Sequence, residues 1–246
     1  MALLEGWVPR RPLTTSKAVR WFNNLGIVTV STLIVRILFP LMPVGFALMA
    51  SEKGWGLLNN LPLPSWLAVL AGIVIFDFFI YLQHVVFHFM PTLWRLHMVH
   101  HSDLDFDLTT GIRFHPVEIV LSMIIKLGIV YLFGPPALSV LIFEVILNST
   151  AMFSHSNFKL PPGLDRFLRL AIVTPDMHRV HHSVIIRERN SNFGFNLSCW
   201  DRLLGTYRDQ PEKGHEGMVI GLANFRAAEK LGLPRLLAMP FTSRHR

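Results

Sequence analysis

Long apolar stretches alternate with shorter polar segments along this chain. The apolar stretches cover residues 27–50, 66–90, 117–133 and 137–153. A membrane-spanning helix needs about 20 mostly apolar residues, within a range of about 17–25. The first two stretches are long enough, although Pro40 and Pro43 interrupt the first of them. The last two are shorter and are joined by the Gly-Pro-Pro of residues 134–136, which predicts a tight hairpin whose two helices cross the membrane together.

The polar segments indicate how the chain is oriented. Basic residues are frequent before the first stretch and after the fourth, and two more lie between the second and third. The loop over residues 51–65 contains only one basic residue, Lys53. Because cytoplasmic loops carry an excess of Lys and Arg, both termini and the polar segments 91–116 and 154–217 are expected on the cytoplasmic side. The pattern predicts an all-α integral membrane protein with four transmembrane helices and a cytoplasmic helical cap.

The composition agrees with a membrane protein of one domain, residues 1–246. Hydrophobic residues make up 51% of the chain and charged residues only 16%, whereas soluble domains carry about 25% charged residues. The net charge of +7 suits an anionic membrane surface. It would also suit nucleic acid, but the chain has no nucleic-acid-binding motif and its apolar runs argue against that partner. The single cysteine, Cys199, excludes an intrachain disulfide and a thiolate metal cluster.

Four charged residues interrupt the apolar stretches, where each is costly unless it is paired or faces a cavity. They are Arg36, Asp77, Lys126 and Glu144. Lys126 and Glu144 lie equally far from the centre of the Gly-Pro-Pro turn, so a straight hairpin places them at the same depth and predicts that they pair. Asp77 is expected to line a cavity below the histidines described next, or to pair with Arg36.

Histidines form three boxes with helical spacing: "HVVFH", "HMVHH" and "HRVHH". Residues separated by three or four positions share a face of a helix, so each box presents its imidazoles together. Imidazole is a ligand for zinc, copper, iron and nickel, and eight imidazoles are too many for one ion. We therefore expect two metal ions, bound by His84, His88, His97, His100, His101, His178, His181 and His182.

Other polar residues near the boxes are weaker candidates. His155 directly follows the fourth stretch, at the same membrane boundary as the first box, and is expected to be a ninth ligand. Asn148 lies seven residues before it, on the same helix face, and could hold a metal-bound water or form a hydrogen bond. His115 opens the third stretch and is expected either in the outer sphere of the metals or near lipid headgroups. His215 and His245 are expected to be structural or exposed.

Acidic residues near the boxes could orient the N–H groups of the ligands. The candidates are Asp103, Asp105, Asp107, Asp176 and Glu188. Among them Asp176 lies within the third box segment, "PDMHRVHHS". We expect no catalytic side chain beyond the metal ligands themselves.

The three boxes in this order resemble those of the fatty acid hydroxylase / sterol desaturase superfamily. The segments "PDMHRVHHS", "RFHPVE", "NFG" and "WDRLLGTY" are similar to bacterial members, and the resemblance covers roughly residues 73–207. It implies a histidine-ligated di-iron enzyme that hydroxylates or desaturates a lipid, with the eight box histidines and His155 at the matching positions. Ala151 stands where some members carry a further histidine, which implies unequal ligation, with a water or Asn148 completing one shell.

The resemblance also implies cofactors, partners and a location. Breaking an unactivated C–H bond requires a cofactor, here two iron ions with O₂ as co-substrate; zinc can replace iron in purified protein. The chain has no dinucleotide fingerprint, cysteine cluster or haem motif, so a separate ferredoxin, cytochrome or reductase must deliver electrons. The substrate is expected to be a lipid from the bilayer, and the membrane is expected to be a bacterial inner membrane.

Two other function classes stay open at this stage. A zinc-dependent membrane hydrolase would need a carboxylate as acid or base, and eight or more histidines are excessive for it. A non-catalytic metal or lipid carrier would have histidines at several depths along the spans, whereas here they cluster at one membrane face. The boxes are common to hydroxylases and desaturases, so both reactions remain compatible with the sequence.

Overall fold

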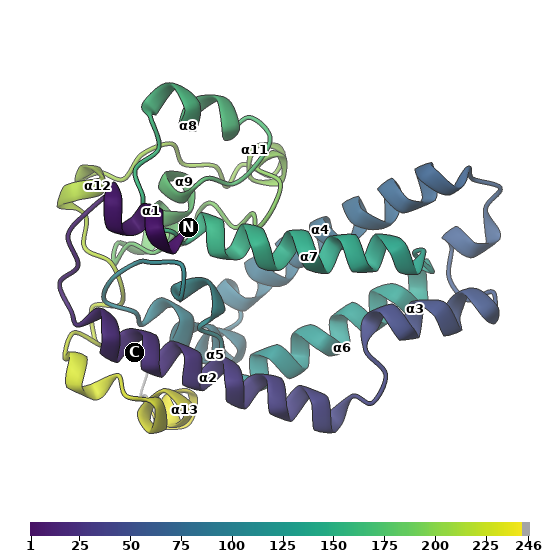
Figure 1. Ribbon diagram of the computed structural model, residues 1–246, viewed down its shortest axis with the longest axis horizontal. Helices are drawn as coiled ribbons and strands as arrows, with labels where there is room; N and C mark the ends of the chain where they lie inside the picture. Colours follow the sequence, from purple (N-terminus) through teal and green to yellow (C-terminus); the bar gives the residue numbers. More distant parts are fainter. Residues whose placement is uncertain (243–246) are drawn as a thin grey trace.

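Four long apolar helical segments pack alongside one another in the structure (Figure 1), a computed structural model that describes residues 1–242. His245 lies outside the described residues. The segments are α2 (Lys17–Leu38) with α3 (Pro43–Glu52), α4 (Ser65–Phe89), α6 (Pro116–Phe133) and α7 (Ala137–Ser154). All four are long and apolar enough to cross a membrane. The described residues contain no strand, so the prediction of an all-α protein with four candidate spans is confirmed.

The first segment differs from the predicted stretch over residues 27–50. Its helix begins at Lys17, after Ser16, whose side chain accepts a hydrogen bond from the Val19 N–H. The helix ends at Leu38, and α3 begins with Pro43 in its first turn, where a proline needs no N–H partner. Hydropathy alone missed the first turns because their buried residues are polar, and Arg20 there pairs with Asp103 at 2.7 Å.

The hairpin of α6 and α7 has the predicted form. Gly134 ends α6 in the left-handed region, at φ +57°. A Cβ at this position would lie 2.3 Å from the Trp55 carbonyl oxygen, so the turn requires glycine. The Nζ of Lys126 donates to both Glu144 carboxylate oxygens, at 2.7 and 2.9 Å, which confirms the predicted ion pair. The bounds of α4, α6 and α7 agree with the predicted stretches to within one residue.

The predictions for Asp77 were wrong. Its carboxylate accepts hydrogen bonds from the indole N–H of Trp200, at 2.7 Å, and from the Leu197 N–H, at 3.3 Å. Asp77 therefore neither pairs with Arg36, which is exposed, nor lines the cavity. A segment more than 100 positions further along the chain folds back onto α4 and donates both of these hydrogen bonds to Oδ2 of Asp77.

Short helices form a cap at one end of the long segments (Figure 1). Within residues 91–116 and 154–217 they are α5 (Pro91–His101), η2 (Thr110–Ile112), α8 (Pro162–Leu168), α9 (Pro175–His181), α10 (Ile186–Arg189), α11 (Cys199–Leu203) and α12 (Gly214–Gly217). The remaining short helices are α1 (Ala2–Trp7), η1 (Leu58–Asn60), η3 (Ala228–Lys230) and α13 (Leu233–Thr242). The cap extends beyond the predicted ranges, because Leu236 and Met239 of α13 share a hydrophobic core with Met98 of α5 and Ile27 of α2.

Candidate metal centre

The three histidine boxes lie on elements that meet where the cap joins the long helices. His84 and His88 are on the last turns of α4, and α5 follows at once, with Pro91 in its first turn. Met90 ends α4 and precedes α5 in extended conformation, so the chain turns sharply and α5 packs back against α4. The third box lies on α9 and the residue after it, and His155 directly follows α7.

The nine histidines converge in two adjoining groups, within each of which the candidate ligand atoms lie within 4.8 Å of one another. One group contains His84, His88, His97, His101 and His181; the other contains His100, His155, His178 and His182. All nine are buried. The rings of His101 and His182, from different groups, stack with centroids 4.5 Å apart, so the two groups form one centre.

The histidines of the second and third boxes are shared between the two groups, according to the direction in which each points from its helix. Residues four positions apart stay together: His97 and His101 belong to the five-histidine group, whereas His178 and His182 belong to the four-histidine group. The remaining histidine of each of these boxes, His100 or His181, joins the other group. The expectation that a whole box faces one way is thus too simple, although all nine expected residues meet.

The donor atoms fit metal ions. The Nδ1 atoms of His84 and His155 each lie 2.7 Å from a backbone carbonyl oxygen. A carbonyl only accepts, so Nδ1 carries the proton and Nε2 of the neutral ring presents a lone pair. The Nε2 of His155 lies 3.1–3.2 Å from the Nε2 atoms of His100, His178 and His182. One lone pair cannot accept from three donors, whereas nitrogens about 2.1 Å from a shared ion lie roughly 3 Å apart.

Burial keeps these imidazoles neutral, which is the form that binds metal. It lowers the pKa of His97 to about 3 and that of His155 to about 3. Burial together with neighbouring imidazoles also lowers the pKa values of His100, His178 and His182 well below their usual range. The folded protein therefore resists protonation of the site at neutral pH.

These depressed pKa values predict that the metal-free protein is acid-labile. Histidine in the unfolded chain has a pKa of about 6.5, so between about pH 6.5 and pH 3 the unfolded state binds more protons. The free energy of unfolding should then fall as the pH falls. Thermal unfolding of chelator-treated protein in detergent, followed from neutral to acidic pH, should show a Tm that declines from about pH 6.5 downwards. A Tm independent of pH across this window would contradict the prediction.

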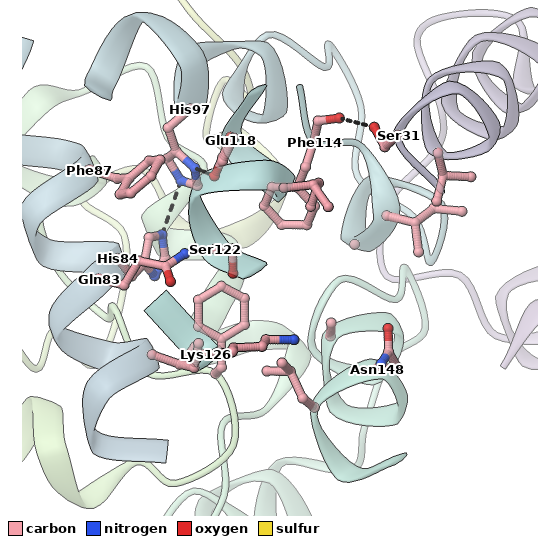
Figure 2. Close-up of a pocket in the computed structure, with 18 of the residues that line it drawn as sticks. Ser31, Gln83, His84, Phe87, His97, Phe114, Glu118, Ser122, Lys126 and Asn148 are labelled. Carbon is pink, nitrogen blue, oxygen red and sulfur yellow. Dashed lines mark hydrogen bonds and ion pairs between the residues drawn. The ribbon is translucent and has the colours of Figure 1, made fainter. Parts of the chain in front are cut away.

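A carboxylate that sequence reasoning missed supports one candidate ligand. The buried Glu118, in the first turn of α6, accepts a hydrogen bond at 2.7 Å from Nδ1 of His97 (Figure 2). Such a partner fixes the tautomer and orientation of a ligating imidazole. Glu118 stands in the motif "RFHPVE", apart from the histidine boxes, and nothing local in the sequence shows that α6 packs against α5.

We predict that Glu118→Gln weakens metal binding by about 10–100-fold, as is typical when an outer partner of a ligand is altered. The amide oxygen still accepts from His97, but an amide cannot ionise to balance the charge of a bound metal ion. Metal dissociation constants of the purified protein, measured by competition with a chelator, test this. Asp176→Asn is the matched control, since Asp176 binds arginines instead of a histidine ligand; an equal loss in both variants would contradict the specific role of Glu118.

The expected outer partners lie elsewhere. His115 caps α6: its Nδ1 accepts from the Val117 N–H at 3.2 Å and its Nε2 donates to the Leu237 carbonyl at 3.1 Å. Asp176 pairs with Arg10, at 3.1 Å, and with Arg179. Both ring nitrogens of His115 and both oxygens of Asp176 are therefore engaged away from the nine histidines.

Asn148 lines a cavity beside the centre but donates to the Glu144 carbonyl, at 2.7 Å, on its own helix. His215 is buried, 3.7 Å from an Asp176 oxygen, and lies outside both histidine groups. Its structural role agrees with the expectation from sequence.

The remaining acidic candidates hold the cap together. Asp103 and Asp107 pair with Arg20, Asp105 accepts from Thr14 and Thr15, and Glu188 accepts from the Glu212 N–H. Burial alone would raise the pKa of Asp103, but the Arg20 guanidinium holds it well below its usual range. Asp103, Asp105 and Asp107 thus fix the loop after α5 to the N-terminal segment.

A cavity of about 240 Å³ opens beside the centre, between α2, α4, α6 and α7 (Figure 2). His84 and His97 form part of its wall. A molecule in this cavity would therefore contact the five-histidine group from within the bundle of long helices.

Comparison with known proteins identifies relatives whose names describe enzymes of lipids or long-chain compounds. An ornithine lipid hydroxylase of Rhizobium tropici is 33% identical over 184 residues, covering 74% of this chain and 53% of the relative. Human alkylglycerol monooxygenase is 30% identical over 179 residues, covering 68% of this chain and 37% of the relative. A very-long-chain aldehyde decarbonylase of Oryza sativa is 27% identical over 173 residues, covering 68% of this chain and 63% of the relative.

The chain thus spans about half of the first relative and little more than a third of the second. No solved structure matches it significantly. The family model described as fatty acid hydroxylase matches residues 69–206, more than half of the chain, and this region contains all nine histidines of the centre. The resemblance predicted from the histidine boxes is confirmed: the chain belongs to the fatty acid hydroxylase family.

Proposed function

We propose that this protein is a membrane-bound di-iron oxygenase that hydroxylates or desaturates a lipid, using O₂ and externally supplied electrons. The observation that carries the proposal is the convergence of nine buried histidines beside a cavity within the long helices. The hydroxylase and monooxygenase names of two relatives support it. We propose the nine histidines as the metal ligands and residues 1–246 as one domain.

The protein's own residues would position the reactants. When bound, two iron ions would supply the redox chemistry needed to break an unactivated C–H bond with O₂. Backbone carbonyls and Glu118 fix the rings of His84, His97 and His155 from behind. The buried site limits access of water, and the cavity brings a lipid to the wall formed by His84 and His97.

Electrons would come from a separate carrier. Hydroxylation places one oxygen atom in the product and releases the other as water, so reducing equivalents must be supplied from outside. We propose a ferredoxin, cytochrome or reductase, which the net charge of +7 would help to attract if the carrier is acidic. The excess of basic residues in the polar segments supports a cytoplasmic cap and cytoplasmic termini. We propose a bacterial inner membrane as the location.

The zinc hydrolase alternative is less well supported by the geometry. A hydrolase would need a carboxylate free to act as acid or base. At the centre, Glu118 uses Oε1 to hold Nδ1 of His97, at 2.7 Å, and only its Oε2 has no hydrogen-bond partner within residues 1–242. Nine histidines also exceed the three protein ligands that a catalytic zinc site uses. Zinc in purified protein would not by itself decide between the two, because a more available ion can occupy histidine sites. Dependence of turnover on O₂ decides between them.

Lipid profiling of cells with and without the gene tests the proposed function. We expect one lipid class to gain the mass of an oxygen atom, or to lose the mass of two hydrogen atoms, only in cells that express the wild-type chain. Cells that express the chain with His181→Ala serve as the matched control. Identical lipid profiles in all three strains would contradict the proposal.

A further inference from the structure

One wall of the cavity carries a column of polar side chains on α6. Glu118, Ser122 and Lys126 follow one another at four-residue spacing and all line the cavity (Figure 2). Four residues of helix rise about 6 Å and return to nearly the same face. The column therefore leads from Glu118, which binds the candidate ligand His97, two turns down into the bundle of long helices.

The facing helix α7 continues this pattern. Glu144 binds Lys126, and Asn148 lies one turn nearer to the metal centre. Ala151, a further turn along, accepts the Nδ1 proton of His155 through its carbonyl. Seven residues separate Glu144 from Ala151, a rise of about 10 Å. The ion pair thus lies about 10 Å below the metal centre, inside the bundle.

Several of these polar groups have unused hydrogen-bonding capacity. Within residues 1–242, the Oε1 of Gln83, beside His84, and the Oε2 of Glu118 are buried without a hydrogen-bond partner. The side chains of Lys126 and Glu144 are still 12% and 25% exposed despite their pairing. A hydrocarbon chain packed against these groups would leave them unsatisfied, which is unfavourable. Ionisable residues within a membrane often mark the path of a substrate.

The cavity also reaches the outer surface of the bundle. Thr32 on α2 and Asn148 on α7 both line it, and both are exposed. Its mouth therefore lies between α2 and α7, at the height of the membrane-spanning segments. Hydrocarbon chains passing through this mouth would lie in the bilayer.

We propose that the cavity takes a lipid by its polar end. The headgroup lies between the Lys126–Glu144 pair and the histidines, while the hydrocarbon chains leave through the mouth between α2 and α7. Because the charges of Lys126 and Glu144 cancel, the headgroup is uncharged or zwitterionic and both donates and accepts hydrogen bonds. This inference rests on the proposed function and specifies its substrate: the reacting carbon belongs to the headgroup or lies next to it.

Photo-crosslinking of the metal-loaded full-length protein in nanodiscs, without O₂, tests this orientation. Two monoacylglycerol probes are compared, one with a diazirine on the headgroup and one with the diazirine at the end of the acyl chain. We expect the headgroup probe to label peptides containing residues 83–87 and 114–126. This labelling should be at least about tenfold stronger than that by the chain-end probe, which corresponds to a difference of about 1.4 kcal/mol in binding free energy between the two orientations. Preferential labelling by the chain-end probe, or equal labelling by both, would overturn the inference.

Variants test the contribution of the ion pair. Lys126→Met combined with Glu144→Leu removes both charges together. Labelling of the same peptides by the headgroup probe should fall about tenfold, whereas labelling by a hexadecane-based diazirine should not change. Thr29→Val, which removes a hydroxyl from an exposed position on α2, should change neither. An equal fall for both probes in the double variant would show a purely structural ion pair and reject its role in recognition; if that variant does not fold, the wild-type orientation result decides.

The crosslinking result is independent of catalysis. Labelling requires neither O₂ nor electrons, so headgroup labelling without O₂-dependent product would reject the oxygenase function and leave this binding mode in place. Chain-end labelling near the histidines, together with O₂-dependent product, would reject the binding mode alone.

Discussion

Replacement of His181 by alanine is expected to abolish product formation while leaving the protein in the membrane. His181 belongs to the five-histidine group; its Nδ1 donates to the Ser191 carbonyl at 2.7 Å, and its buried Nε2 has no hydrogen-bond partner among residues 1–242. If His181 is a ligand as proposed, loss of this donor removes or displaces a metal ion. The effect should exceed the roughly 10–100-fold that changes to outer partners cause. Metal content per chain, product formation and the membrane-bound fraction are measured together.

The matched control for this variant is His215→Ala. His215 is also buried in the cap but lies outside both histidine groups, so its loss should leave the metal content unchanged. Insertion should survive in both variants, because the four apolar segments that favour the membrane do not contain His181. Wild-type metal content and turnover in His181→Ala would refute the assignment of this histidine as a ligand.

Exclusion of O₂ from the wild-type protein should have an equally large effect. An oxygenase cannot form product without O₂, even when lipid, metal and reductant are present. With isotopically labelled O₂, a hydroxylated product should carry the label, whereas a desaturated product should carry none and lack two hydrogen atoms. Mass spectrometry of the lipid product distinguishes these outcomes.

The same measurement separates the competing functions. A zinc hydrolase would remain active without O₂, and any oxygen it adds would come from water. A carrier would give no product under either condition. Lipid turnover that persists in purified protein without O₂, or label that arises only from water, would reject the oxygenase function.

Local features were predictable from the sequence because short-range physics determines them. Apolar length fixed the bounds of α4, α6 and α7 to within one residue. The Gly-Pro-Pro turn fixed the register of the hairpin, and with it the pairing of Lys126 and Glu144. Hydropathy did not predict the start of α2, because the buried residues of its first turns are polar. Their partners in the cap, such as Asp103 for Arg20, stabilise the helix there.

For the metal centre, too, the sequence predicted some features and left others to the tertiary structure. Histidine spacing identified eight of the residues that the structure gathers, and the position of His155 after the fourth apolar stretch identified the ninth. It did not show that neighbours such as His100 and His101 enter different groups. Successive residues on a helix point about 100° apart, so the partner of each depends on which helix packs on that side.

The sequence by itself therefore determined the membrane-spanning helices, the hairpin and the identity of the clustered histidines, since each depends on residues close together in the chain. Only the tertiary structure decided that Glu118 supports His97, that Trp200 donates to Asp77, and that a polar column leads from the metal centre to Lys126. Such contacts join residues from separate helices. They follow from how the helices pack, which no local spacing of residues encodes.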